Sequence, residues 1–276
     1  MTSDAKARAA ATYNAASDGY DDPALSFWDR FGRRTVERLD LAPGSGVLDV
    51  CCGSGASAIP AAERVGAHGR VLAVDLSAGL LALARAKAER RRLTNIEFRL
   101  GDLESLGLPS DHFDAVICVF GIFFIPEMTA AARELWRMVR PGGSIALTTW
   151  GQGVFEPMNS IFWDSIGAER PDLHKGFNPW DRISEPDSLR QLLLDAGVTE
   201  PECIAEAGEH PLATPDDWWR IVMGSGYRWT VDQLDPAARD RVRQRNLSHA
   251  RAADIRSINA GVVYGSGRKP RSFNPS

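Results

Sequence analysis

Between residues 46 and 150 the sequence repeats a short apolar run followed by a helix-forming stretch, and this rhythm limits the fold more than any other feature. The apolar runs predict strands at 47–50, 71–74, 96–100, 113–119 and 144–149, and helices are predicted at 56–65, 78–91 and 126–139. Continuous Val, Ile and Leu runs that alternate with helices are typical of a parallel sheet covered on both faces. We therefore predict an α/β fold for this part of the chain.

The sequence outside this region predicts further elements and divides the chain into four segments. Helices are predicted at 2–11, 24–39, 185–196, 214–223 and 236–253, and strands at 201–206 and 258–264. Residues 151–182 are rich in Gly, Pro and aromatic residues and predict an irregular cap. We expect 1–40 to close over the site as helices, 41–150 to form the core, 151–265 to supply the cap with the last helix and strands, and 266–276 to form a loose tail.

Charge and cysteine content narrow the class of protein. The 276 residues carry a formal net charge of −4, and no broad run of Lys or Arg predicts a nucleic-acid surface. No apolar run approaches the ~18 residues that a membrane span needs, and residues 1–16 lack the apolar centre of a signal peptide. Cys51, Cys52, Cys118 and Cys203 show no zinc-like spacing, so we expect reduced thiols, no metal site and a cytoplasmic protein. The sequence leaves the oligomeric state open, a homodimer being one option.

The first predicted strand of the core runs into a loop that can receive a nucleoside ligand. The loop region holds Asp49, Cys51, Cys52, Gly53, Ser54 and Gly55. Glycine lets the backbone approach a ligand closely, and the start of the following helix points free N–H groups at that ligand. Asp75 ends the next strand, where a carboxylate can accept both ribose hydroxyls. The spacing Gly53-x-Gly55-x-x-Ala58 also fits the degenerate dinucleotide fingerprint, so an NAD-linked oxidoreductase is an alternative at this point.

Three further features favour S-adenosylmethionine (SAM) over NAD. The Asp49 carboxylate would repel a pyrophosphate, but it would attract the cationic amino group of the methionine part of SAM. Asp102 lies between Gly101 and Leu103 at the end of the strand at 96–100, where its carboxylate can take the adenine amino group. The strand at 113–119 is followed by a helix and then by the Arg-Pro-Gly-Gly turn at 140–143.

On these motifs the chain resembles the class I SAM-dependent methyltransferases, specifically the ubiquinone/menaquinone C-methyltransferase-like group. The matching motifs lie at 47–55, 74–77, 101–102, 113–116 and 140–143, and Cys51 takes the place of the first glycine of the family's loop. The resemblance implies a Rossmann-like fold with a seven-stranded, mostly parallel sheet, an antiparallel last strand, helices on both faces and an inserted aromatic-rich cap. It also implies SAM as the cofactor and S-adenosylhomocysteine as the product. The residues expected at the cofactor are Asp49, Cys51, Gly53, Ser54, Gly55, Asp75, Leu76, Gly101, Asp102, Leu103, Val119 and Phe120.

Aromatic residues around the core predict where a methyl acceptor binds. The candidates are Tyr20, Trp28, Phe123, Phe124, Trp150 and Trp180. His174 and His210 lie in the cap region and are candidate general bases, although a surface or structural histidine would look the same in the sequence. We expect methyl transfer to carbon or oxygen of a small aromatic or apolar metabolite. The alternative is a SAM-binding enzyme on the same fold that does not methylate and instead promotes a rearrangement or cyclisation.

Overall fold

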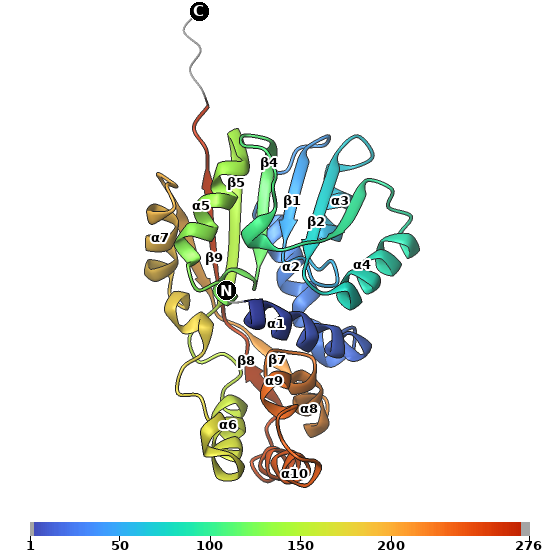
Figure 1. Cartoon of the computed structure of the whole chain (residues 1–276), viewed down its shortest axis with the longest axis vertical. Helices are drawn as coiled ribbons and strands as arrows, with labels where there is room; N and C mark the ends of the chain where they lie inside the picture. The colour runs from blue at the N-terminus through green and yellow to red at the C-terminus, as the bar shows by residue number, and fades with distance from the viewer. Residues whose placement is uncertain (1–2, 272–276) are drawn as a thin grey trace, which may run out of the picture.

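The computed structural model describes residues 3–271, and a seven-stranded sheet lies at its centre (Figure 1). The strand order is β3-β2-β1-β4-β5-β9-β6, and β9 runs antiparallel to its neighbours β5 and β6. The strands are β1 (Gly46–Val50), β2 (Arg70–Asp75), β3 (Ile96–Leu100), β4 (Phe113–Val119), β5 (Val139–Trp150), β6 (Glu202–Glu206) and β9 (Val262–Arg268). The predicted fold class, a mostly parallel sheet with an antiparallel last strand, is therefore confirmed.

Both faces of the sheet are buried because successive strand residues point to opposite sides. Val47, Ala115 and Ile117 pack on the side of α2 (Phe27–Glu37), α3 (Ala58–Val65) and α4 (Ala78–Arg90). Leu48 and Val116 point the other way, toward α5 (Met128–Met138) and α7 (Pro186–Asp195). This double coverage explains why the strands read as continuous apolar runs rather than as alternating apolar and polar residues.

A second group of elements, which we call the cap lobe, lies beyond the carboxyl ends of the parallel strands (Figure 1). The cap lobe comprises α6 (Met158–Glu169), α8 (Pro215–Met223), α9 (Arg228–Val231), α10 (Pro236–Ala252) and the small sheet of β7 (Glu209–Pro211) and β8 (Ser257–Asn259). Its centre is Tyr227, whose ring lies 4.8 Å from that of Phe162 and 5.8 Å from that of Trp218, measured between ring centroids. The Tyr227 hydroxyl donates to Asn159 at 2.7 Å.

The N-terminal helix α1 (Ser3–Ala16) lies between the cap lobe and the sheet in Figure 1. It is longer than the predicted helix at 2–11. The short 3-10 turns η1 (Ser17–Gly19) and η2 (Pro23–Leu25) lead from it to α2. The helix predicted at 24–39 therefore begins only at Phe27, because Asp22 accepts the Ala24 N–H at 2.9 Å and starts a separate 3-10 turn.

The chain after Trp150 differs from the prediction in three places. The irregular cap predicted at 151–182 contains the regular helix α6, which buries Phe162, Trp163 and Ile166. The strand predicted at 258–264 is divided between β8 and β9, since the Asn259 side chain accepts the Gly261 N–H at 2.9 Å and turns the chain there. The prediction of a loose tail from residue 266 is wrong as far as Arg268, because β9 continues to that residue. Residues 272–276 lie outside the described part of the chain.

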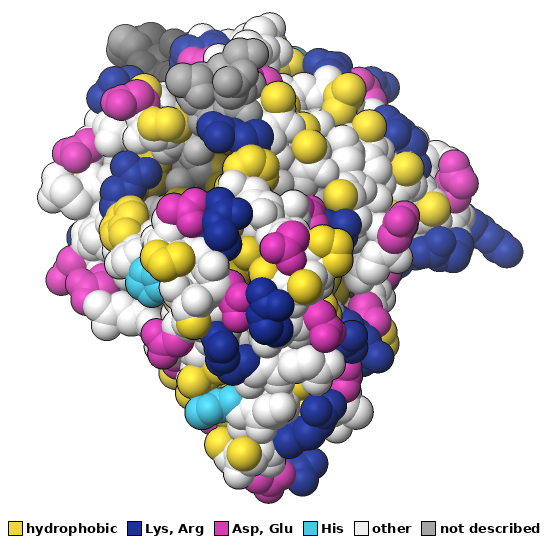
Figure 2. Space-filling view, turned by 60° about the horizontal axis from the view of Figure 1, so that its bottom comes forward, with side chains coloured by type: hydrophobic (Ala, Val, Ile, Leu, Met, Phe, Trp, Pro, Cys, Tyr) yellow, Lys and Arg dark blue, Asp and Glu magenta, His cyan; other side chains and the backbone are white. Residues whose placement is uncertain are grey.

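The cap lobe presents acidic and basic side chains intermixed on the face seen in Figure 2. The arginines of α10 pair with acids of neighbouring elements, for example Arg241 with Glu169 at 2.8 Å and Arg243 with Asp216 at 3.0 Å. These pairs break up the positive charge of the helix. None of the helices within residues 3–271 has the length and apolar character needed to cross a membrane.

The remaining short helices complete the described chain. They are η3 (Leu103–Ser105), η4 (Ile122–Phe124), η5 (Pro171–Leu173) and η6 (Pro179–Ile183). The first two matter most for function, because they follow β3 and β4 directly at the carboxyl edge of the sheet. In open α/β sheets this edge is where ligands bind.

Candidate active site

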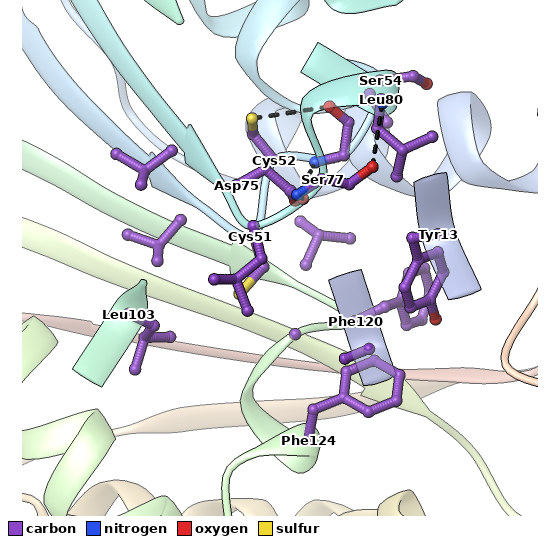
Figure 3. Close-up of a pocket in the computed structure, with 18 of the residues that line it drawn as sticks. Tyr13, Cys51, Cys52, Ser54, Asp75, Ser77, Leu80, Leu103, Phe120 and Phe124 are labelled. Carbon is purple, nitrogen blue, oxygen red and sulfur yellow. Dashed lines mark hydrogen bonds between the residues drawn. The ribbon is translucent and has the colours of Figure 1, made fainter. Parts of the chain in front are cut away.

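A cavity lies at the carboxyl ends of β1, β2, β3 and β4, and all the residues that line it fall between Ala9 and Ile125 (Figure 3). It encloses about 990 Å³ of empty space, part of which is open to solvent. Its lining combines polar groups at the ends of β1, β2 and β3 with apolar side chains, the kind of lining that small-molecule sites have.

The turn after β1 brings backbone N–H groups to the cavity because three of its residues adopt left-handed backbone conformations. Cys51, Gly53 and Gly55 have φ angles of 59°, 53° and 87°. A side chain on Gly55 would also meet Ile59, whose Cδ1 lies 3.0 Å from the position of an added Cβ. Cys51 is the exception, since only glycine adopts such angles without strain.

Asp75 fixes this turn at the end of β2. Its carboxylate accepts the N–H of Gly53 through Oδ2 and that of Ser77 through Oδ1, both at 2.8 Å. Burial raises the pKa of Asp75, and the two backbone hydrogen bonds oppose that rise. Each carboxylate oxygen can accept more than one hydrogen bond, so Asp75 can still receive the hydroxyls of a ribose.

Asp102 occupies the equivalent place after β3. Its Oδ1 accepts the Glu104 N–H at 2.9 Å, and its Oδ2 accepts a short hydrogen bond from Lys6 of α1. Lys6 also pairs with Glu104 at 2.9 Å. The helix α1 is thus attached to the rim of the cavity at the end where an adenine would meet Asp102.

A second attachment holds α1 over the end of β2. The Asn14 side-chain oxygen accepts the Ser77 hydroxyl at 2.8 Å and the Gly79 N–H at 2.9 Å, so α1 supplies an N-terminal cap to α4. Between the two attachments, Ala9, Ala10 and Tyr13 line the cavity. Sequence reasoning missed these residues, and the one available signal was that Tyr13 is the sole aromatic residue of α1.

Asp49 is fully buried behind the turn and does not line the cavity. Its Oδ2 accepts the Ser57 hydroxyl at 2.7 Å, whereas Oδ1 has no hydrogen-bond partner among the described residues. Burial raises its pKa to about 7, against the opposing effect of the Ser57 hydrogen bond. An unpartnered, buried carboxylate oxygen beneath the turn favours a cation nearby, which fits the ammonium group of SAM.

Most of the residues expected at the cofactor line this cavity. They are Cys51, Gly53, Ser54, Asp75, Leu76, Gly101, Asp102, Leu103, Val119 and Phe120. The structure places Asp49 and Gly55 behind the wall instead, where they support the turn.

The residues expected at the acceptor divide into two groups. Tyr20, Trp28 and Phe124 line the cavity. Trp150 does not, because it is 2% exposed and stacks on Phe120 with ring centroids 4.0 Å apart.

Phe123 and Trp180 also lie away from the cavity wall. Phe123 is buried and its ring meets that of Trp180 edge-on, with centroids 5.7 Å apart. The expectation that Phe123, Trp150 and Trp180 face an acceptor is therefore not met, since these side chains serve the packing between core and cap.

Neither candidate base reaches the cavity. His174 is exposed beside α6, with its ring centroid 6.3 Å from that of Trp163. His210 is 3% exposed and donates from Nε2 to the Ala24 carbonyl at 2.8 Å. Burial lowers its pKa, so the imidazole is neutral and structural.

The four cysteines carry free thiols, and one pair meets beneath the cavity. A hydrogen bond with Cys118, together with burial, raises the pKa of Cys51 well above its usual value. The Cys51 side chain occupies the space beside Gly121, where an added Cβ would lie 2.5 Å from its own Cβ. Within residues 3–271 no group of His, Cys, Asp and Glu side chains is arranged to hold a metal ion.

Comparison with known proteins identifies a matching family and several relatives. A family model described as a methyltransferase domain matches residues 47–143. Nocamycin O-methyltransferase of Saccharothrix syringae is 36% identical over 235 residues, which cover 79% of this chain and 83% of the relative. Demethylmenaquinone methyltransferase of Listeria welshimeri is 31% identical over 190 residues, covering 65% of this chain and 80% of the relative. Aklanonic acid methyltransferase DauC of Streptomyces sp. strain C5 is 35% identical over 137 residues, or 50% of this chain and 62% of the relative.

Solved structures share the fold. The YcgJ protein of Bacillus subtilis superimposes with a TM-score of 0.58 at 16% identity, covering 88% of this chain and 100% of that protein. The cyclase SpnF superimposes with a TM-score of 0.53 at 22% identity, covering 88% and 81%. At these identities the likeness concerns the fold alone. The motifs, the cavity and the sequence relatives together establish that the chain belongs to the class I SAM-dependent methyltransferases of the ubiquinone/menaquinone C-methyltransferase-like group, with SAM as its cofactor.

Proposed function

We propose that the protein transfers the methyl group of SAM to a carbon or oxygen atom of a small aromatic or apolar metabolite. The observation that carries this proposal is the wall next to Val119, where Tyr13, Phe120 and Phe124 line the cavity. No His, Lys or Arg is among the described residues of its lining. Such a wall suits a flat organic acceptor rather than a phosphorylated one. The names of the relatives, which refer to nocamycin, demethylmenaquinone and aklanonic acid, support a small organic acceptor.

The chain contributes position and exclusion of water rather than a base. When bound, SAM would supply the methyl group of its sulfonium to a nucleophilic atom of the acceptor, and S-adenosylhomocysteine would leave. Asp75 and Asp102 would hold the adenosine end, and α1 would cover it. Aromatic faces such as that of Phe120 can stabilise the cation by about 0.5–2 kcal/mol. Ordering of the two reactants inside the cavity would then lower the barrier.

The acceptor must lose its proton without help from a basic side chain of the protein. Burial, the largest effect, and the neighbouring Asp75 raise the pKa of the Tyr13 and Tyr20 hydroxyls, so both are neutral near pH 7. The Cys51 and Cys52 thiols are also neutral, because a hydrogen bond with Cys118 and burial raise the pKa of Cys51, and burial raises that of Cys52. A phenol, an enol, a carboxylic acid or an activated ring carbon can react without a protein base, so these are the acceptor groups that we propose.

Transfer of a labelled methyl group tests the proposal. The purified protein is incubated with methyl-labelled SAM and a panel of reduced naphthoquinones, phenols and aromatic carboxylic acids. We expect label in an organic product together with an equal amount of S-adenosylhomocysteine. A product that forms without label would support the non-methylating alternative. Absence of any labelled product, from a protein that binds S-adenosylhomocysteine, would contradict the proposed acceptor class.

A further inference from the structure

Tyr13 and Phe124 meet across one side of the cavity, although they belong to different elements. Tyr13 lies on α1 and Phe124 on η4, and their rings meet edge to face, with centroids 6.0 Å apart and planes at 78°. Both side chains are half-buried and line the cavity. In Figure 3 they lie toward Phe120 and away from Asp75. The two rings therefore form an aromatic boundary of the cavity on the side away from the expected ribose position.

The contact between the two rings involves no polar interaction. Among the described residues the Tyr13 hydroxyl has no hydrogen-bond partner, and it points toward Gly226 of the cap lobe, 3.8 Å from the position of a Cβ there. The Tyr13 ring is supported by that of Tyr20, with centroids 6.5 Å apart, and the Phe124 ring by that of the buried Phe123, at 4.8 Å. Rotation of the two side chains away from each other thus breaks no hydrogen bond.

The two rings lie next to the place where the proposed function locates the methyl transfer. The cofactor would cross the ends of β3, β2 and β1, so its methyl group would point toward β4, the next strand of the sheet. The turn η4 follows β4 after Phe120 and Gly121, and both of these residues line the cavity. An acceptor atom that reaches the methyl group would therefore bring the rest of the acceptor against Tyr13 and Phe124.

The spacing of the two rings favours a flat ligand. A planar ring that packs between two parallel ring faces needs about 7 Å between their centroids, twice the ~3.5 Å of a carbon–carbon contact. The centroids of Tyr13 and Phe124 are already 6.0 Å apart, so rotation of the rings and a further opening of about 1 Å admit such a ligand. A saturated ring is thicker, because its hydrogen atoms project from both faces.

We propose that Tyr13 and Phe124 select the acceptor by a planar aromatic ring, which packs between their rings and replaces the contact that they make with each other. This narrows the proposed acceptor class from aromatic or apolar metabolites to aromatic ones. Both residues determine specificity, and the ring faces rather than the Tyr13 hydroxyl carry the effect. The inference rests on the proposed function for the location of the acceptor.

Two probes with the same carbon skeleton test this selection. 2-Naphthol is flat and aromatic, whereas decahydro-2-naphthol is saturated. Their binding to the full chain saturated with S-adenosylhomocysteine is measured by calorimetry. We expect the wild type to bind 2-naphthol about tenfold more tightly, the effect of one or two aromatic ring contacts. Burial of apolar surface alone would give no such preference, because the saturated probe is at least as apolar.

Tyr13→Leu and Phe124→Leu each remove one ring and keep an apolar side chain. We expect the preference for 2-naphthol to fall below about threefold in both variants. Tyr13→Phe is the matched control, because it keeps the ring and removes only the hydroxyl, so the tenfold preference should remain. The affinity of each variant for S-adenosylhomocysteine is measured first, which ensures that the cofactor site is filled. Should one leucine variant fail to fold, the other variant and the wild type still decide.

Several results would overturn the proposal. They are no binding of 2-naphthol to the wild type, equal binding of the two probes, and a preference that survives in either leucine variant. Loss of the preference in Tyr13→Phe would assign the selection to the hydroxyl and would overturn it as well. Methyl transfer from labelled SAM is followed separately, so absence of a labelled product with the preference intact would contradict the proposed function and leave the ring selection standing.

Discussion

Single residues at the cavity differ in how their charge is compensated, and Asp49 is the extreme case. It is fully buried, and one of its oxygens has no partner among the residues described. Burial raises its pKa from 3.8 to about 7. A rise of this size favours the protonated form in the folded protein by about 4 kcal/mol.

The sign of the resulting pH dependence follows from proton binding. Between about pH 4 and pH 7 the folded protein keeps the Asp49 proton, whereas the unfolded chain releases it. The contribution of Asp49 to stability is therefore most favourable below pH 4 and declines as the pH rises to 7. We expect Asp49→Asn to match the wild type near pH 4 and to exceed it above pH 7 by up to about 4 kcal/mol.

Urea denaturation at a series of pH values measures this difference. A constant difference between variant and wild type across that range would refute the raised pKa. The same variant is expected to bind S-adenosylhomocysteine more weakly at pH 8, since it lacks the negative charge behind the turn. Stability and cofactor affinity would then change in opposite directions, as is common for residues kept for function.

Cys51 and Gly121 form a second pair whose identities depend on each other. A methyl group on Gly121 would lie 2.5 Å from the Cys51 Cβ and 2.7 Å from its sulfur. We expect Gly121→Ala to destabilise the protein by about 1–3 kcal/mol through overpacking. In a Cys51→Gly background the loss should be smaller, because the two closest contacts are gone and only the Cys118 sulfur, at 2.9 Å, remains. A double-mutant cycle by urea denaturation checks this, and additive losses would show that the two sites are independent.

At the scale of elements, α1 covers the cavity, and its position depends on a close approach to α4. A Cβ on Gly79 would lie 2.8 Å from the Ser17 hydroxyl oxygen and 3.3 Å from the Asn14 side-chain oxygen. We expect Gly79→Ala to push α1 away from the cavity and to speed dissociation of S-adenosylhomocysteine about tenfold, a change of about 1.4 kcal/mol. Stopped-flow displacement measures this rate.

Gly19→Ala provides the comparison for that experiment, because nothing lies within 4 Å of a Cβ at this position. The melting temperature of Gly79→Ala is expected to change little, because the helix preference of alanine over glycine offsets part of the contacts that α1 loses. An unchanged dissociation rate would mean that the cofactor does not leave by way of α1.

The elements that the sequence predicted well are those whose limits depend only on residues close by in the chain. The strands β3 and β4 match their predicted limits, because short apolar runs between turn residues need no distant partner to be recognised. The turn at Cys51–Gly55 was recognisable for the same reason, since glycines and acids at fixed spacing carry the signal. By contrast, the helix α6 was missed because Ile161, Phe162 and Trp163 form a continuous apolar run, which weakens the helical alternation of apolar and polar residues in the sequence.

For the whole molecule, the sequence could not predict which aromatic residues face the cavity. Trp150 and Trp28 look alike in the sequence, yet Trp150 packs on Phe120 in the core while Trp28 lines the cavity. Their roles depend on how α1, α2 and the cap lobe dock on the sheet, which involves contacts far apart along the chain. For the same reason the sequence did not predict that Tyr13 lines the cavity.

The cap lobe contacts α1, the helix that covers the cavity. Arg8 of α1 lies over the Trp229 ring at 5.4 Å, whereas no residue beyond Ile125 lines the cavity in the described structure. We expect His174→Ala to leave the rate of methyl transfer and its pH profile unchanged, because His174 is exposed and distant from the cavity. A fall in the rate of methyl transfer in this variant would instead assign His174 a role as base.

The central claim is that the cavity between α1 and the carboxyl ends of β1–β4 holds SAM. A crystal structure of the protein with S-adenosylhomocysteine tests this most directly. We expect the adenine amino group at Asp102, the ribose hydroxyls at Asp75 and the amino-acid end over the turn at Gly53 and Ser54, all beneath α1. Ligand density outside this cavity, or an adenosine oriented away from Asp75, would contradict the account.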